Sequence, residues 1–227
     1  ENISEVEALK HACIYHHSEL HINWIDSDEI TEKNAGSILK NMDGILIPGG
    51  FGVRGTEGKI NAARYARENK IPFLGLCLGM QIAIVEFARH VCGMTDANSI
   101  EMNPNTQYPV IDFLPGQSEY SMLGGTLRLG KYPCKVLPET KAFEAYKEEV
   151  IYERHRHRYE VNNEYRDILR EKGMIFCGTS PNNSVVEMIE LENHPWYVAC
   201  QFHPEFKSRP NRPHPLFLGF INAAVTK

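Results

Sequence analysis

The chain has 227 residues, 42% of them apolar, and a formal net charge of −5. This length and composition are typical of a globular protein and argue against a disordered chain or a repeat array, so we take residues 1–227 as one domain. The small excess of acidic residues argues against a surface that coats nucleic acid.

The first 95 residues predict helices and strands that alternate at short spacing. We expect helices over 4–16, 56–68 and 78–90, and strands over 20–26, 43–47 and 71–76. Ser4 is expected to cap the first helix, with Val6, Leu9 and either Cys13 or Ala12 on its apolar face. The alternation favours an α/β fold, an open and mostly parallel twisted sheet flanked by helices.

The second half of the chain has a different pattern. Residues 103–121 are polar and rich in turn residues, which predicts an ordered excursion or lid. Short strands are then expected, as extra antiparallel strands, over 126–129, 151–161, 174–178, 185–191 and 197–202, followed by a helix over 215–225.

Cys77 is the candidate nucleophile. It lies in a G-x-C-x-G sequence between an apolar strand and an amphipathic helix, which is the cysteine form of a nucleophile elbow. Gly75 and Gly79 suit a turn in which two backbones approach closely. The turn would place the sulfur at a helix N-terminus, where partial positive charge favours a thiolate. The alternative is a buried structural cysteine.

His203 and Glu205 are the candidate base and its orienting acid. A strand leads directly into His-Pro-Glu, and in extended backbone residues at i and i+2 point the same way. Glu205 can then hold one ring nitrogen of His203 while the other faces a thiol, as in a catalytic triad. The alternative is a solvated histidine near a loop.

Residues 47–52 follow a strand and expose backbone N–H groups. The amides of Gly50 and Leu78 are the candidate oxyanion hole. Residues 50–55 also match G-x-G-x-x-G, with Glu68 at a plausible distance for a ribose contact, a weak indication of a dinucleotide site. The preceding Pro-Gly suits a tight turn at an oxyanion loop at least as well.

Two motifs, G-x-C-x-G-x-Q over 75–81 and Q-F-H-P-E over 201–205, together resemble those of class I glutamine amidotransferases. More specifically, the chain resembles the C-terminal glutaminase domain of the CTP synthase family over nearly its whole length. Five stretches carry this resemblance: PGGFGVRG (48–55), ARENKIPFLGLCLGMQ (66–81), LGGTLRLG (123–130), ERHRHRYEVN (153–162) and NHPWYVACQFHPEF (193–206).

The resemblance implies that Cys77, His203 and Glu205 hydrolyse glutamine to glutamate and ammonia through a glutamyl thioester. The family's glutamine contacts fall on Gly50, Leu78, Gly79, Met80, Gln81, Glu101 and Arg158. Glu101 also makes sense from the residue alone, because the ammonium of a free amino acid needs a counter-charge. Arg158 lies in a basic run that is equally well a solvated strand face.

The resemblance also implies partners outside this chain. Ammonia would pass to an N-terminal synthetase domain of the same polypeptide, which aminates UTP to CTP with ATP and Mg²⁺ and responds to GTP as an activator. The full enzyme is expected to be a homo-oligomer, a tetramer. No P-loop pattern occurs here, so we expect the synthetase domain to lie outside this chain. Residues 112–122 are expected to move on activation.

Cofactors, metals and membranes are not expected in this domain. The six cysteines form no CxxC pair, and His155 with His157 lacks further zinc ligands at plausible spacing. Residues 71–88 are apolar but are interrupted by Pro72 and two glycines, which disfavours a membrane span. The acidic first residues lack the apolar core of a signal peptide, so we expect a cytoplasmic protein. From the net negative charge, we expect no nucleic-acid partner.

Four other functions compete with this interpretation. A γ-glutamyl hydrolase, or another class I amidotransferase, would use the same scaffold and a similar cysteine elbow. A papain-like protease would carry C-G-[SA]-C-[WY] around its cysteine, and that sequence is missing. A regulatory module without activity would require a broken triad, whereas all three residues are present.

Overall fold

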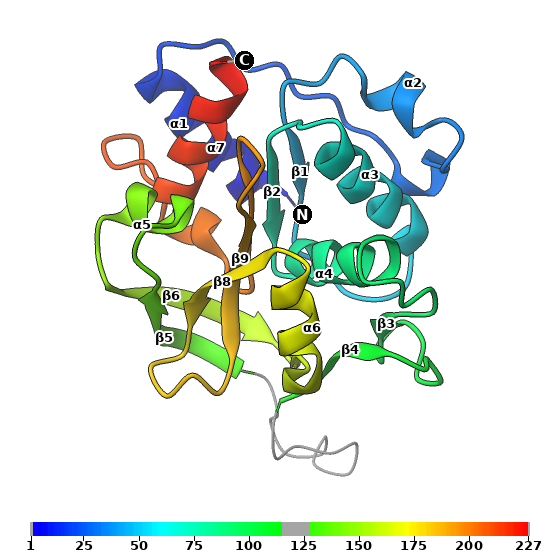
Figure 1. Ribbon diagram of the computed structural model, residues 1–227. Coiled ribbons are helices and arrows are strands. Elements are labelled where there is room, and N and C mark those ends of the chain that lie inside the picture. Colours follow the sequence, from blue (N-terminus) through cyan, green and yellow to red (C-terminus); the bar gives the residue numbers. More distant parts are fainter. Residues whose placement is uncertain (1, 115–127, 227) are drawn as a thin grey trace.

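The computed structural model describes residues 2–114 and 128–226. Helices cover both faces of a central sheet (Figure 1). The helices are α1 (Ile3–Tyr15), α2 (Ala35–Leu39), α3 (Thr56–Glu68), α4 (Leu78–His90), α5 (Lys141–Tyr146), α6 (Arg166–Glu171) and α7 (Pro215–Val225), with the 3₁₀ helices η1 (Ser27–Glu29), η3 (Asn163–Tyr165) and η4 (Pro204–Lys207). The strands are β1 (Ile45–Ile47), β2 (Phe73–Leu76), β3 (Asn98–Ser99), β4 (Pro109–Phe113), β5 (Arg128–Val136), β6 (Val150–His157), β7 (Tyr159–Val161), β8 (Met174–Thr179), β9 (Val186–Leu191) and β10 (Tyr197–Cys200).

The central sheet has seven strands in the order β1-β2-β10-β9-β8-β5-β6. Strands β1, β2 and β10 run parallel, and the four remaining pairings are antiparallel. The expected α/β class is confirmed, with its extra antiparallel strands, but "mostly parallel" is wrong for the described sheet, because four of its six strand pairings are antiparallel. A second sheet has the order β3-β4-β7.

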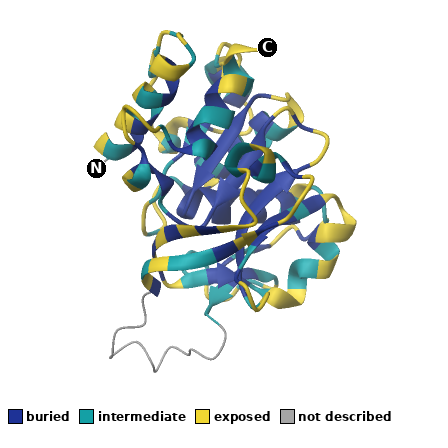
Figure 2. Cartoon of the chain, turned by 90° about the vertical axis from the view of Figure 1, so that its left-hand side faces the viewer, coloured by how far each residue is buried: buried dark blue, intermediate teal, exposed yellow. Residues whose placement is uncertain are grey.

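The core lies on both faces of the central sheet around β2, β9 and β10, whose residues are buried along the whole length of each strand (Figure 2). Strands β5 and β6 instead alternate buried residues with more exposed ones. Side chains alternate along each strand. In β10, Tyr197 and Ala199 pack with α3 and α4, whereas Val198 and Cys200 pack with α1 and α7. The parallel strands therefore end in a rigid edge that can hold a site.

The structure corrects two details near the N-terminus. Ser4 lies inside α1, whose N-cap is Asn2 without a side-chain cap. The buried residues of α1 are Glu5, Ala8, Ala12 and Cys13; Leu9 packs half-buried against the same core, and Val6 is also only half-buried. Residues 20–26 are irregular rather than a strand. None of these seven residues is buried, so their alternation has no sheet to pack on.

The expected strand over 151–161 is divided. It bends at Arg158, so that β6 belongs to the central sheet and β7 pairs with β4 in the second sheet. β5 extends to Val136, and residues 126–127 of the expected strand lie outside the described residues. The lid expected over 103–121, and the movement expected over 112–122, fall partly on residues 115–127, which also lie outside them.

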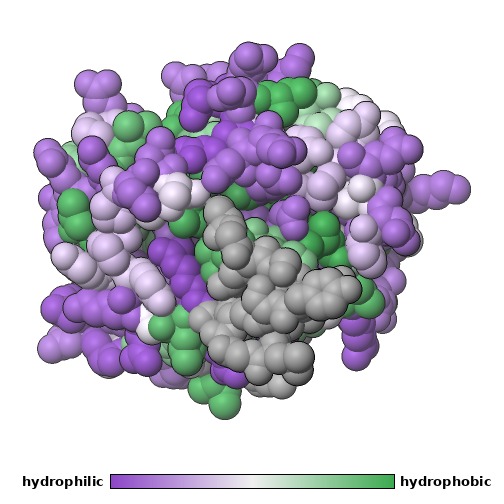
Figure 3. Space-filling view, turned by 90° about the horizontal axis from the view of Figure 1, so that it is seen from below, coloured by the Kyte–Doolittle hydropathy of each residue, from purple (hydrophilic) through white to green (hydrophobic). Residues whose placement is uncertain are grey.

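Viewed from below, the surface is mainly hydrophilic, with separate hydrophobic side chains among the polar ones (Figure 3). Within residues 2–114 and 128–226, no helix is long and apolar enough to cross a membrane.

Candidate active site

Cys77 lies at a sharp turn between β2 and α4. Its backbone has φ 50° and ψ −100°, a conformation that a non-glycine residue rarely adopts outside functional sites. The flanking glycines make the turn possible. A Cβ on Gly75 would lie 2.7 Å from the carbonyl oxygen of Gly79, and a Cβ on Gly79 would collide with the carbonyl oxygen of Ile47. The close backbone approach expected from the sequence is confirmed.

The parallel pairing of β2 with β10 brings the two other candidate triad residues towards Cys77. Leu76 lies opposite Cys200, and the amide of Cys77 donates to the Cys200 carbonyl at 2.7 Å. The chain then passes beside the nucleophile to His203. Nδ1 of His203 lies 2.7 Å from Oε1 of Glu205, which is buried at the start of η4.

The charge state of His203 follows from these neighbours. Burial alone would lower the pKa of His203, but its hydrogen bonds to Cys77 and Glu205 outweigh burial and raise this pKa to about 10. The ring therefore holds a proton at neutral pH. An imidazolium beside a thiol is the arrangement that activates cysteine nucleophiles.

The loop after β1 completes the surroundings of the sulfur. Gly49 lies against the triad, since a Cβ there would lie 2.9 Å from Cε1 of His203 and 3.6 Å from Cβ of Cys77. Leu78 is the first residue of α4, so its amide has no partner within the helix. Gly50 and Leu78 both line the cavity over Cys77.

The dinucleotide alternative gains no support from this loop. Glu68 is the last residue of α3, roughly 20 Å along the helix from the glycines, at 1.5 Å per residue. Its carboxylate accepts from Nε of Arg64 at 2.9 Å.

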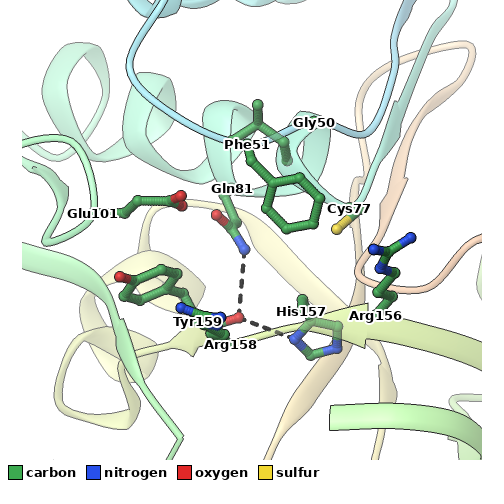
Figure 4. A pocket seen from close by; sticks show the side chains of 10 residues that line it. Gly50, Phe51, Cys77, Gln81, Glu101, Arg156, His157, Arg158 and Tyr159 are labelled. Atoms are coloured by element: carbon green, nitrogen blue, oxygen red, sulfur yellow. Dashed lines mark hydrogen bonds between the residues drawn. The ribbon is translucent and has the colours of Figure 1, made fainter. Parts of the chain in front are cut away.

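A cavity of about 360 Å³ opens beside Cys77 (Figure 4). It is lined by Gly50, Phe51, Cys77, Leu78, Gln81, Glu101, Arg156, His157, Arg158 and Tyr159. Oε1 of Glu101 accepts from the amide of Gly52 at 3.3 Å, which fixes the carboxylate at one wall. One carboxylate and two guanidinium groups match the ammonium and carboxylate of a free amino acid.

The structure gathers most of the predicted site residues. Gly50, Leu78, Gln81, Glu101 and Arg158 lie around this cavity with Cys77, and His203 and Glu205 lie beside Cys77 without lining it. Two residues lie elsewhere. Met80 is fully buried in the core, and Gly79 packs against the β1 backbone.

Sequence reasoning missed several neighbours of the site. Nε2 of Gln201 lies 3.5 Å from the Cys77 sulfur, and the signal was present, since Gln201 opens the Q-F-H-P-E motif. Phe51, Arg156 and Tyr159 line the cavity without a comparable signal. Among the described residues, no group of three or more His, Cys, Asp or Glu side chains is placed to hold a metal.

Comparisons with known proteins place the chain in a family. The family model for class I glutamine amidotransferases matches residues 2–223. The chain belongs to the class I glutamine amidotransferase family.

Within this family, the chain is similar to CTP synthase. It is 61% identical over 223 residues to the CTP synthase of Carboxydothermus hydrogenoformans and 63% identical over 225 residues to that of Moorella thermoacetica. These alignments cover 98% and 99% of the chain, which spans 42% of the length of both relatives. The solved glutaminase domain of Trypanosoma brucei CTPS with bound acivicin is 36% identical, with a TM-score of 0.94, over 100% of this chain and 88% of that one. The resemblance found in the sequence to a CTP synthase glutaminase domain is thereby confirmed.

Proposed function

We propose that this chain is a glutaminase that releases ammonia from the side-chain amide of L-glutamine through the triad of Cys77, His203 and Glu205. The observation that carries the proposal is the arrangement of side chains where the paired strands β2 and β10 end. There, a cysteine at a strained turn lies beside a histidine that is hydrogen-bonded to it, and Nδ1 of this histidine is 2.7 Å from a buried glutamate.

The reaction has two stages in this proposal. The Cys77 sulfur attacks the amide carbon, the amides of Gly50 and Leu78 hold the oxyanion, and the C–N bond breaks as His203 gives its proton to the departing ammonia. Water then attacks the thioester while His203 takes its proton, the C–S bond breaks, and glutamate leaves. Glu205 keeps the ring in place throughout.

The cavity supports glutamine as the substrate. Glu101 would meet the α-ammonium, and Arg158 would meet the α-carboxylate or shape the pocket around it. Gln81 also faces this space. Gly79 and Met80 would contact glutamine through their backbone only. A Cβ on Gly79 would collide with the β1 backbone, and the Met80 side chain is buried in the core.

The ammonia has a proposed destination outside this chain. By similarity to CTP synthase, we propose that this is the glutaminase part of a longer polypeptide in which ammonia converts UTP to CTP with ATP and Mg²⁺, with GTP as activator and a homo-oligomeric enzyme. The described residues do not fit a Mg²⁺ site, since they offer no cluster of three acidic or histidine ligands.

The deciding experiment replaces the nucleophile in the full polypeptide that carries this chain. Cys77→Ala should abolish CTP formation from glutamine and leave CTP formation from added ammonium chloride intact. Loss of both reactions would give Cys77 a structural role and contradict the proposal. Glutamine or γ-glutamyl peptide hydrolysis that never yields CTP would favour a γ-glutamyl hydrolase instead.

A further inference from the structure

Gln201 is a fully buried amide beside the nucleophile that the proposed mechanism leaves unused. Its Nε2 atom lies 3.5 Å from Sγ of Cys77, a distance at which an N–H can donate to sulfur. Its Oε1 atom lies 3.2 Å from Nε2 of Gln81, on the wall of the cavity. The amide therefore joins the sulfur to a pocket residue.

The direction of these hydrogen bonds follows from a backbone carbonyl. Nε2 of Gln81 lies 3.4 Å from the carbonyl oxygen of Tyr159, which can only accept (Figure 4). The atom facing it must be the amide nitrogen of Gln81, and the same nitrogen donates to Oε1 of Gln201. The nitrogen of Gln201 then faces Cys77, as a donor.

Two buried histidines extend the same chain of hydrogen bonds. Nδ1 of His157 lies 3.2 Å from the Tyr159 carbonyl and must also donate to it. Nε2 of His157 is then an acceptor, and Nδ1 of His155 donates to it at 2.8 Å. Burial, with neighbouring positive charge, lowers the pKa of His155 to about 2 and that of His157 to about 3, so both rings stay neutral as this direction requires.

This chain of hydrogen bonds ends at the buried carboxyl group of Glu187. Nε2 of His155 is left as an acceptor 3.5 Å from Oε2 of Glu187, and among the described residues neither atom has a hydrogen-bond partner. A proton on this oxygen would satisfy both atoms. Burial raises the pKa of Glu187 to about 7 even though Arg128 pairs with its other oxygen. In the hydrogen-bond chain from Glu187 to Gln201, it is thus settled for each side chain which atom donates and which accepts.

We propose that Gln201 is a positioning residue for the nucleophile: its side-chain N–H donates to the Cys77 sulfur and stabilises the thiolate, and Gln81 with the Tyr159 carbonyl holds it in that direction. The inference rests on the proposed function. Cys77 is 3% exposed, so water provides little solvation of a charged sulfur. His203 faces the sulfur as a charged donor, and Gln201 adds a second, neutral one.

The test compares variants in the full polypeptide that carries this chain. Gln201→Met keeps the length of the side chain without its donor, and Gln201→Glu keeps the acceptor for Gln81 but replaces the donor. Val198→Ala is the control, because Val198 is equally buried in β10, three residues before Gln201, but lies on the opposite face of the sheet from α4. Iodoacetamide alkylation of Cys77, followed by peptide mass spectrometry from pH 5 to 10, reports the thiolate directly.

Both Gln201 variants should shift the alkylation profile of Cys77 to higher pH and lower kcat roughly tenfold, with KM changed less than about twofold, as for one lost hydrogen bond to a charged group. Val198→Ala should lower thermal stability while leaving the alkylation profile in place. In the unmodified protein, the side-chain ¹H–¹⁵N signals of Gln201 should shift when Cys77 is alkylated, which needs no variant to fold.

Two failures are distinguishable. Suppose that Cys77→Ala abolishes glutamine hydrolysis, while Gln201→Met has the same pH profile of Cys77 alkylation and the same kcat as the protein without substitutions. The role of Gln201 is then overturned and the proposed function stands. If Cys77→Ala still hydrolyses glutamine, the proposed function itself fails. Unchanged amide signals on alkylation would also overturn the contact with sulfur.

Discussion

The backbone of Gly49 lies so close to the His203 ring that a Cβ on Gly49 would stand 2.9 Å from Cε1 of the imidazole. Gly49→Ala must therefore push His203 away from Cys77 or move the oxyanion loop. A displacement of about 1 Å at reacting groups costs on the order of 10²-fold in rate. We expect kcat for glutamine hydrolysis to fall by that factor in a steady-state assay.

The matched control for this substitution is Gly36→Ala. Gly36 lies in α2, where a Cβ would meet only a ring atom of Tyr65 at an ordinary 3.7 Å. The Gly36→Ala substitution should leave kcat for glutamine hydrolysis unchanged. An active Gly49→Ala enzyme would show that the loop yields at little cost and that the close approach does not set the position of His203.

Glu101 is expected to govern substrate affinity rather than chemistry. Glu101→Gln keeps the shape of the side chain but removes the charge opposite the substrate ammonium. A hydrogen bond to a charged group contributes about 1.5–3 kcal/mol, so KM for glutamine should rise roughly ten- to hundredfold, with a smaller change in kcat. The exposed Glu164→Gln is the control. An unchanged KM would remove Glu101 from the binding site.

The buried histidines predict a loss of stability in acid. Burial lowers the pKa of His155 to about 2 and of His157 to about 3, from 6.5. Below pH 6.5 the unfolded chain takes up protons that the folded one refuses, so stability is fully present above pH 6.5 and is lost as pH falls towards the folded values. Each ring contributes a slope of about 1.4 kcal/mol per pH unit.

Glu187 acts in the opposite direction over part of this range. Burial raises its pKa from 4.5 to about 7, so the folded state holds the extra proton between these values and stability falls there as pH rises. Urea unfolding at several pH values should show a net acid loss that becomes steeper in Glu187→Gln. Ring ¹⁵N signals of His155 and His157 that titrate near pH 6 would contradict the prediction.

A buried ion pair between α3 and α4 supports the helix that starts at the nucleophile. Arg67 donates to both oxygens of Glu86, from Nη2 at 2.7 Å and from Nε at 2.9 Å, and the Glu86 side chain is fully buried. Arg67→Met leaves that carboxylate without its main partner and should cost about 3 kcal/mol of unfolding free energy, measured in urea.

The double variant Arg67→Met/Glu86→Met provides the check. Replacing both partners removes the buried charge, so part of the lost stability should return. If the two losses simply add, the pair is not coupled in the way that the geometry indicates.

Local signals in the sequence were sufficient for the elements next to the site. The predicted bounds of α3 and α4 agree with the structure, because apolar spacing and flanking glycines define them within the segment itself. The turn at Cys77 was predicted for the same reason. The segment 20–26 failed, since alternation predicts a strand only where another strand is available to pair with it.

Tertiary contacts decided what the sequence could not predict. The direction of the strands from β5 to β9 depends on pairings between distant segments, so the antiparallel part of the sheet was underestimated. The triad candidates came from motifs, whereas the contact of Gln201 with sulfur depends on the register of β10 against β2. The approach of Gly49 to His203 likewise depends on how the loop after β1 folds over that edge.

The proposed nucleophile Cys77 and its proposed base His203 are 126 positions apart in the chain, yet they follow the ends of two strands that are hydrogen-bonded neighbours. Their separation is therefore set by the spacing of one strand pair, and the long intervening segment does not determine it. Insertions and deletions between α4 and β10 can change the cavity and its partners while the reacting atoms keep their places. One catalytic centre could in this way be joined to many different consumers of ammonia.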